Sequence, residues 1–166
     1  DLLDADKTYE AELKLGVTTD SGDAEGQIIA TVAVDVEKDA IFKVLPQFVG
    51  DIAQVPPMHS ALKRNGRPLY ELARKGIEVE REARAVTIHA IELLAFSGDR
   101  VTLRVSCSKG TYIRVLAADI GAALGCGAHL VGLRRTRVGD LDLARSVTLA
   151  ELESMDEAGR AGRLQP

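Results

Sequence analysis

The chain has little of what disulfide-rich, zinc-binding or membrane proteins depend on. Its 166 residues include no tryptophan, three tyrosines, three phenylalanines and two cysteines. Cys107 and Cys126 lack the spacing of a zinc site, so we expect no metal, no disulfide framework and a reduced, cytoplasmic protein. No apolar run is long enough to cross a bilayer, and no charged-then-apolar leader is visible, so we expect no membrane partner.

Acidic residues slightly outnumber basic ones, and the basic residues are unevenly distributed along the chain. The net charge is −4, and residues 1–57 carry twelve acidic and four basic side chains. Residues 58–84 carry seven basic and four acidic side chains, and residues 100–137 carry seven basic ones and a single acidic one. Because phosphate binding needs local rather than total positive charge, these two segments permit nucleic-acid binding. A merely solvated arginine-rich face is the alternative.

The segment 107–114, Cys-Ser-Lys-Gly-Thr-Tyr-Ile-Arg, joins two elements of different periodicity. Apolar and polar residues alternate through 100–108, which predicts a strand. Apolar residues then recur at helical spacing through 112–124. We expect Thr111 to cap this helix and Gly125 to end it in the left-handed conformation.

The corner between these elements carries Lys109, Tyr112 and Arg114. Arg114 falls in the first helical turn, where the helix dipole disfavours a cation. We therefore expect an anion, from a substrate or from the protein, to meet Arg114 there. The alternative is an exposed corner with a solvated lysine and arginine.

The remaining pattern predicts an α+β fold with a mainly antiparallel sheet, because the strands do not alternate regularly with helices. Further strands are expected at 7–16, 27–34, 83–96, 131–138 and 143–147, and further helices at 36–48 and 149–158. Pro46 should disturb the last turn of the helix at 36–48.

Residues 58–76 are predicted to form a projecting basic insertion. Asn65-Gly66 signals a tight hairpin turn, and Pro68 is expected to open a short helix over 69–75. A long surface loop is the alternative. Because long structured insertions in compact domains are commonly functional, we favour a binding role.

Together these motifs resemble the bacterial tRNA pseudouridine synthase B (TruB) family over nearly the whole chain. The matching segments, in family order, are Lys7-Thr8-Tyr9-Glu10-Ala11, residues 19–26, residues 50–63, residues 69–79, residues 108–114, Gly125-Cys126-Gly127-Ala128-His129-Leu130 and Leu133-Arg134-Arg135. The resemblance implies an isomerase that needs no cofactor. It would convert the T-loop uridine of tRNA, position 55, to pseudouridine by flipping the nucleotide, breaking its glycosidic bond and rejoining the base through C5.

The resemblance also implies domain boundaries and residue roles. Residues 1–158 would be part of the family's catalytic domain, with a mixed, mainly antiparallel central sheet and flanking helices. Residues 50–79 would be a thumb-like RNA-binding insertion, and residues 159–166 a loose tail. Tyr9 would stack on the flipped uracil and act as a base at C5, and Arg114 would pair with the catalytic aspartate. Tyr112 and Leu133 would line the uracil pocket. The expected RNA contacts are Lys63, Arg64 and Lys109.

One part of the family pattern is not found. The Gly-His-Thr-Gly-x-Leu-Asp-Pro motif that carries the catalytic aspartate does not occur, and Asp20 and Asp23 lack its context. The C-terminal RNA-binding (PUA) domain common in the family is missing or barely begun. We therefore expect an incomplete catalytic domain, inactive alone, in which Arg114 lacks its carboxylate. Unpaired strand edges in such a chain should favour self-association.

Two other classes of function remain to be compared with the resemblance. A non-catalytic RNA-binding or RNA-folding module would use the same two basic segments as an RNA-modifying enzyme. A metal-dependent hydrolase has little support, because His59, His89 and His129 lie on unrelated segments without ligand spacing.

Overall fold

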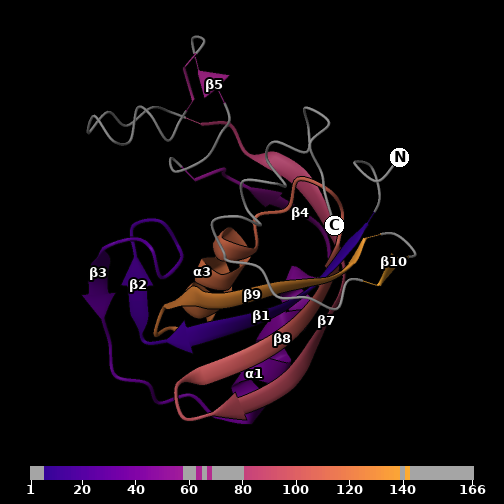
Figure 1. Ribbon diagram of the computed structural model, residues 1–166. Helices are drawn as coiled ribbons and strands as arrows, with labels where there is room; N and C mark the ends of the chain where they lie inside the picture. The colour runs from indigo at the N-terminus through magenta and orange to yellow at the C-terminus, as the bar shows by residue number, and fades with distance from the viewer. Residues whose placement is uncertain (1–5, 58–62, 65–66, 69–80, 139–140, 143–166) are drawn as a thin grey trace.

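The computed structural model describes residues 6–57, 63–64, 67–68, 81–138 and 141–142. Within them, six strands form an antiparallel sheet in the order β10-β9-β1-β8-β7-β4, and two strand pairs, β2-β3 and β5-β6, stand apart from it. The helices lie on one side of the sheet (Figure 1). The elements are β1 (Lys7–Leu15), β2 (Val17–Thr19), β3 (Ile28–Thr31), α1 (Lys38–Val44), the 3-10 helix η1 (Leu45–Phe48), β4 (Gly50–Gln54), β5 (Lys63–Arg64), β6 (Arg67–Pro68), β7 (Arg84–Ser97), β8 (Arg100–Cys107), α3 (Ile113–Leu124), β9 (Ala128–Val138) and β10 (Leu141–Asp142).

Strand β1 lies between β8 and β9 and carries the centre of the core. Its burial alternates residue by residue, so that Tyr9, Ala11, Leu13 and Leu15 are buried and the residues between them are half-buried. Helix α3 packs its apolar residues into the same core as this face of β1. The expected α+β fold with a mainly antiparallel sheet is confirmed.

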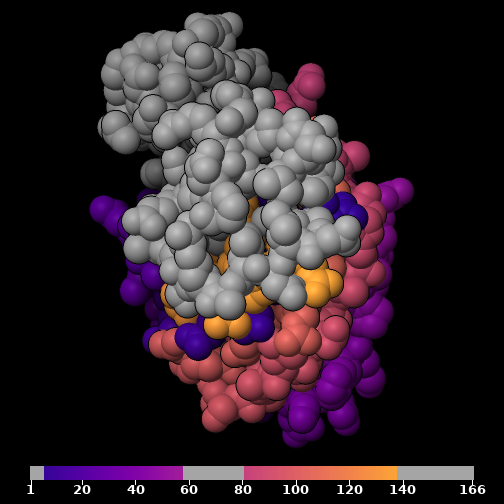
Figure 2. All heavy atoms as spheres, turned by 45° about the vertical axis from the view of Figure 1, so that its right-hand side comes forward, coloured from indigo at the N-terminus to yellow at the C-terminus, as the bar shows by residue number. Residues whose placement is uncertain are grey.

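The opposite face of the sheet is covered by opposite charges that neutralise one another. Nη2 of Arg104 lies 3.7 Å from Oε2 of Glu10, and its Nη1 lies 3.5 Å from Oε2 of Glu92. Nη2 of Arg134 lies 3.4 Å from Oε1 of Glu10. The basic residues of 100–137 therefore do not form one continuous positive strip on this face. In the view of Figure 2, the rose and salmon surface of β7 and β8 is flanked by the purple region that holds α1 and β4.

Several local expectations are confirmed and two are corrected. Pro46 ends α1 early and the chain continues as the 3-10 turn η1, as expected. No strand was expected at Gly50–Gln54, but β4 pairs there with β7 at the edge of the sheet. Thr111 does not cap α3, because its hydroxyl donates to the Ser108 carbonyl at 2.9 Å. Gly125, with φ of 89°, does end the helix.

The basic insertion is described only in part. Strands β5 and β6 pair with Arg64 opposite Arg67, which is the hairpin that Asn65-Gly66 predicts. The helix expected at 69–75, the strand at 143–147 and the helix at 149–158 lie outside the described residues. Among the helices that are described, none has the length and apolar character to cross a membrane.

Close packing of α3 on β9 gives a test of the fold. At Gly121 an added Cβ would collide with the backbone nitrogen of Ala128. Helix propensity alone favours alanine over glycine by about 1 kcal/mol. We predict instead that Gly121→Ala destabilises the chain by about 1–3 kcal/mol in urea unfolding, because the overpacked helix must shift.

Ala122, exposed on the same helix, supplies the control. Ala122→Gly should cost about 1 kcal/mol through propensity alone. An increase in stability on Gly121→Ala would contradict the packing described here.

Candidate active site

The start of β1 and the start of α3 lie at the same end of the sheet. Antiparallel pairing places Lys7 of β1 opposite Cys107, the last residue of β8. The chain then turns and enters α3 directly after Tyr112. Tyr9 therefore lies at the end of the sheet where Tyr112 and Arg114 begin the helix, and all three side chains are buried.

Strand β9 supplies the other side of this region. Its residues Arg135 and Leu133 pair with Tyr9 and Ala11 of β1 and are buried with them. The exposed fractions are 2% for Tyr9, 3% for Tyr112, 6% for Arg114 and 8% for Leu133. All four predicted residues are thus buried: Tyr9 and Leu133 lie in the core that β1, β9 and α3 share, and Tyr112 and Arg114 lie at the start of α3. A flipped base could reach the Tyr9 ring only after neighbouring groups had moved.

A buried ion pair joins α3 to the loop between β2 and β3. Nη1 of Arg114 lies 3.3 Å from Oδ2 of Asp23, and both side chains are almost fully buried. The expectation that an anion meets Arg114 in the first helical turn is confirmed. Arg114 thus has a carboxylate partner within the chain, Asp23, which is not the aspartate of the family's catalytic motif.

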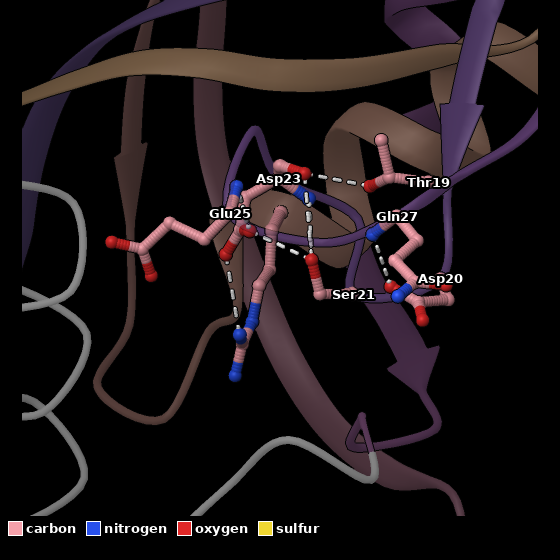
Figure 3. Close-up of polar contacts among 7 residues, drawn as sticks. Thr19, Asp20, Ser21, Asp23, Glu25 and Gln27 are labelled. Atoms are coloured by element: carbon pink, nitrogen blue, oxygen red, sulfur yellow. Dashed lines mark hydrogen bonds and ion pairs between the residues drawn. The ribbon is translucent and has the colours of Figure 1, made fainter.

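The second carboxylate oxygen of Asp23 is held by its own loop (Figure 3). Oδ1 accepts hydrogen bonds from the Ser21 hydroxyl at 2.7 Å and from the Glu25 N–H at 3.0 Å. The Thr19 hydroxyl donates to the Asp23 carbonyl at 2.7 Å. Both carboxylate oxygens therefore have donors within the protein, so Asp23 is suited to orienting Arg114.

The same loop rests directly on the elements that carry the site. The Leu130 N–H of β9 donates to the Gly22 carbonyl at 2.9 Å. Gly22 has φ of 83°, and a Cβ there would lie 3.1 Å from the Arg114 carbonyl oxygen. Only glycine combines this conformation with this approach. Residues 20–26 are rich in turn-forming residues, which indicates a loop. Their sequence does not indicate that Asp23 of this loop pairs with Arg114.

Two further contacts describe the corner itself. The guanidinium carbon of Arg114 lies 6.0 Å from the centre of the Tyr112 ring, within the range of a cation–π contact. Lys109 is exposed on the turn before the helix. Lys63 and Arg64 lie on β5, in a separate two-stranded sheet, so the structure does not gather them with the four buried residues.

Metal ligands do not gather in the part of the chain that the structure describes. It holds no group of three or more histidine, cysteine, aspartate or glutamate side chains that could bind an ion. His129 instead makes a 2.8 Å hydrogen bond through Nδ1 to the Val17 carbonyl, which ties β9 to β2. Neither Cys107 nor Cys126 forms a disulfide, and both are buried.

Two protein-family models together match residues 1–164 of the chain. Residues 1–113 match the N-terminal domain of the TruB family pseudouridylate synthases. The chain belongs to the TruB family. Residues 114–164 match the tRNA pseudouridylate synthase B C-terminal domain, so the boundary between the two matches falls immediately before Arg114.

Relatives of high identity carry the same family name. The chain is 76% identical over its full length to tRNA pseudouridine synthase B of Dechloromonas aromatica, covering 56% of that protein. It is 63% identical over 99% of its length to tRNA pseudouridine synthase B of an Azoarcus species, covering 55% of that protein. The chain thus spans little more than half the length of these relatives.

Solved structures share the TruB-like fold. A chain of a Cbf5–Nop10–Gar1 complex superposes with a TM-score of 0.62 at 32% identity, over 98% of this chain and 40% of that one. An H/ACA RNP bound to a substrate RNA containing 2′-deoxyuridine gives a TM-score of 0.58 at 28% identity, over 99% of this chain and 38% of that one.

The buried pair can be tested with a double-mutant cycle of Asp23→Asn and Arg114→Gln. Removing one partner of a buried ion pair leaves an uncompensated buried charge and costs about 3–5 kcal/mol. We predict that each single change is strongly destabilising in urea unfolding. The double variant should lose at least about 1 kcal/mol less than the sum of the two.

The exposed pair between Arg100 and Glu12, 2.6 Å apart, is the matched control. The same cycle with Arg100→Gln and Glu12→Gln should give a coupling of about 0–1 kcal/mol, because solvent screens the charges. Simple additivity at Asp23 and Arg114 would mean that the two side chains do not interact in solution.

Proposed function

We propose that this chain is part of the catalytic domain of a tRNA pseudouridine synthase that acts on the T-loop uridine in the cytoplasm. Membership of the TruB family supports the reaction class. The observation that supports the proposal is that Tyr9, Tyr112 and Arg114 are all buried, and that Tyr9 lies near the end of β1 that pairs with the end of β8, from which the chain runs into α3. None of the three alone would distinguish a site from ordinary packing.

The reaction fits a site without a cofactor, because it is an isomerisation. The N1–C1′ bond of uridine breaks and a C5–C1′ bond forms, while C5 loses a proton and N1 gains one. We assign the C5 proton to the Tyr9 hydroxyl as acceptor. The Tyr9 ring also replaces the stacking that the flipped base loses, worth about 1–3 kcal/mol. Tyr112 and Leu133 form the walls of the uracil pocket.

The covalent step needs a nucleophile that Asp23 does not supply. Both oxygens of Asp23 already accept hydrogen bonds or pair with Arg114. We propose that the nucleophile is the aspartate of the family's Gly-His-Thr-Gly-x-Leu-Asp-Pro motif, which is not among these 166 residues. A guanidinium has five N–H donors and can serve two carboxylates, so Arg114 would orient this aspartate as well as Asp23. The isolated chain would then be inactive.

The RNA partner is proposed to be the T-arm of tRNA. Lys63 and Arg64 of the insertion, together with Lys109 at the corner, would contact its phosphates. On the face of the sheet opposite the helices, the charges of Arg104 and Arg134 are neutralised by neighbouring glutamates. We therefore favour the insertion, rather than that face, as the docking site.

The assignment of Tyr9 can be tested in this chain joined to the N-terminal segment that carries the aspartate motif. We predict that the joined protein forms pseudouridine in tRNA. Tyr9→Phe keeps the ring but removes the hydroxyl, so product formation should fall about 10²–10⁴-fold, the usual contribution of a general base. The tRNA dissociation constant should stay within a few-fold. Product is measured by base-specific detection of pseudouridine under single-turnover conditions.

Leu13→Val, on the same buried face of β1, controls for damage to the core. It should reduce stability without reducing the rate below the unfolding transition. Two results would contradict the proposal. If the joined protein binds tRNA but never forms pseudouridine, the chain is a non-catalytic RNA-binding module. If Tyr9→Phe is fully active, the hydroxyl is not the base.

The docking assignment predicts a different outcome for Lys63→Glu combined with Arg64→Glu. Losing two phosphate contacts should weaken tRNA binding and lower the slope of log affinity against log salt by about two units. Reversing two exposed lysines of α1, Lys38→Glu with Lys43→Glu, makes the same change in net charge elsewhere. Equal losses of affinity in both double variants would show a general charge effect rather than docking at the insertion.

A further inference from the structure

A buried glutamine of β4 holds the backbone at the start of α3. Gln54 is the last residue of its strand and only 2% exposed. Its Oε1 accepts a hydrogen bond from the Tyr112 N–H at 2.9 Å, and its Nε2 donates to the Tyr112 carbonyl at 3.2 Å. One side-chain amide thus satisfies both backbone groups of a residue 58 positions away.

These two bonds fix the position of the peptide from which α3 begins. Tyr112 is the N-cap residue of the helix, and its own side chain makes no capping hydrogen bond. Its carbonyl also accepts the first helical hydrogen bond, from the Leu116 N–H at 3.1 Å. A shift of Gln54 would therefore move the Tyr112 backbone and, with it, the first helical turn that carries Arg114.

Burial of this amide is not explained by packing alone. A buried polar group without partners is costly, whereas an apolar side chain would fill the same space without that risk. The Gln54 amide avoids this cost because its Nε2 and its Oε1 are both hydrogen-bonded to the backbone of Tyr112. The gain is a defined position for the corner.

Gln54 also connects two regions that the proposed function uses separately. It directly precedes residues 55–57, where the chain leaves the sheet toward the basic insertion. We propose that Gln54 is a positioning residue that keeps Tyr112 and Arg114 aligned with the base of this insertion while RNA is bound there. This inference rests on the proposed function, because it assumes that the insertion docks RNA and the corner serves the reaction.

The first test is Gln54→Met in the protein joined to its N-terminal segment. Methionine has nearly the same length but can replace neither hydrogen bond. Because a misplacement of about 1 Å can cost as much as 100-fold in rate, we expect the single-turnover rate to fall about 10–100-fold. The tRNA dissociation constant should change less than about three-fold, since the phosphate contacts are untouched.

Val86→Ala is the matched control, because Val86 is buried on β7 and pairs with β4 two residues before Gln54. It loosens the same strand pair but leaves the amide bonds to Tyr112 in place. Its rate below the unfolding transition should equal that of the unchanged protein. Equal rates for Gln54→Met and Val86→Ala, or a loss of tRNA binding in proportion to the rate, would overturn the inference.

Gln54→Glu provides a second readout that does not depend on Gln54→Met folding. An ionised carboxylate accepts from the Tyr112 N–H but repels the Tyr112 carbonyl, whereas a protonated carboxyl restores the donor. Its rate relative to the unchanged protein should therefore rise as the pH is lowered. A ratio that stays flat with pH would overturn the inference. If the unchanged joined protein forms no pseudouridine at all, the proposed function fails and this inference fails with it.

Discussion

The candidate site depends on a positive charge buried where a helix begins. The N-terminal turn of a helix already carries partial positive charge, so a guanidinium there is doubly unfavourable without an anion. Asp23 supplies that anion at 3.3 Å, and its loop is in turn held by β9 through Gly22 and Leu130. The ion pair therefore fixes α3, β9 and the loop between β2 and β3 relative to one another.

Local periodicity was sufficient to predict the elements that form the core. The alternation in β1 and β8 and the helical spacing in α3 report directly which side of each element is buried. Strand β4 was missed because its sequence, Gly-Asp-Ile-Ala-Gln, has little strand character of its own. Its conformation comes from pairing with β7, which is a property of the topology rather than of the segment.

The site was less accessible to sequence reasoning than the fold. Tyr9 and Leu133 have the pattern of ordinary core residues, and only the family resemblance marked them. The anion beside Arg114 could be predicted from the helix dipole, but its identity could not, because Asp23 lies 91 positions away. Gln54 and Tyr112 are likewise distant in the sequence, 58 positions apart. Such polar pairs are set by which strands become neighbours, and nothing in either local segment specifies that.

The distribution of charge and burial separates docking from chemistry in the proposed enzyme. Flipping a base out of its stack costs a few kcal/mol, and restacking on one ring returns about 1–3 kcal/mol. With Tyr9 almost fully buried, opening the pocket adds to that cost. The balance must come from contacts made elsewhere on the RNA, because remote binding energy can offset distortion at the reacting centre. A docking surface on the insertion is useful only if its position is transmitted to the pocket, and Gln54, at the end of β4, bonds directly to the peptide from which α3 begins.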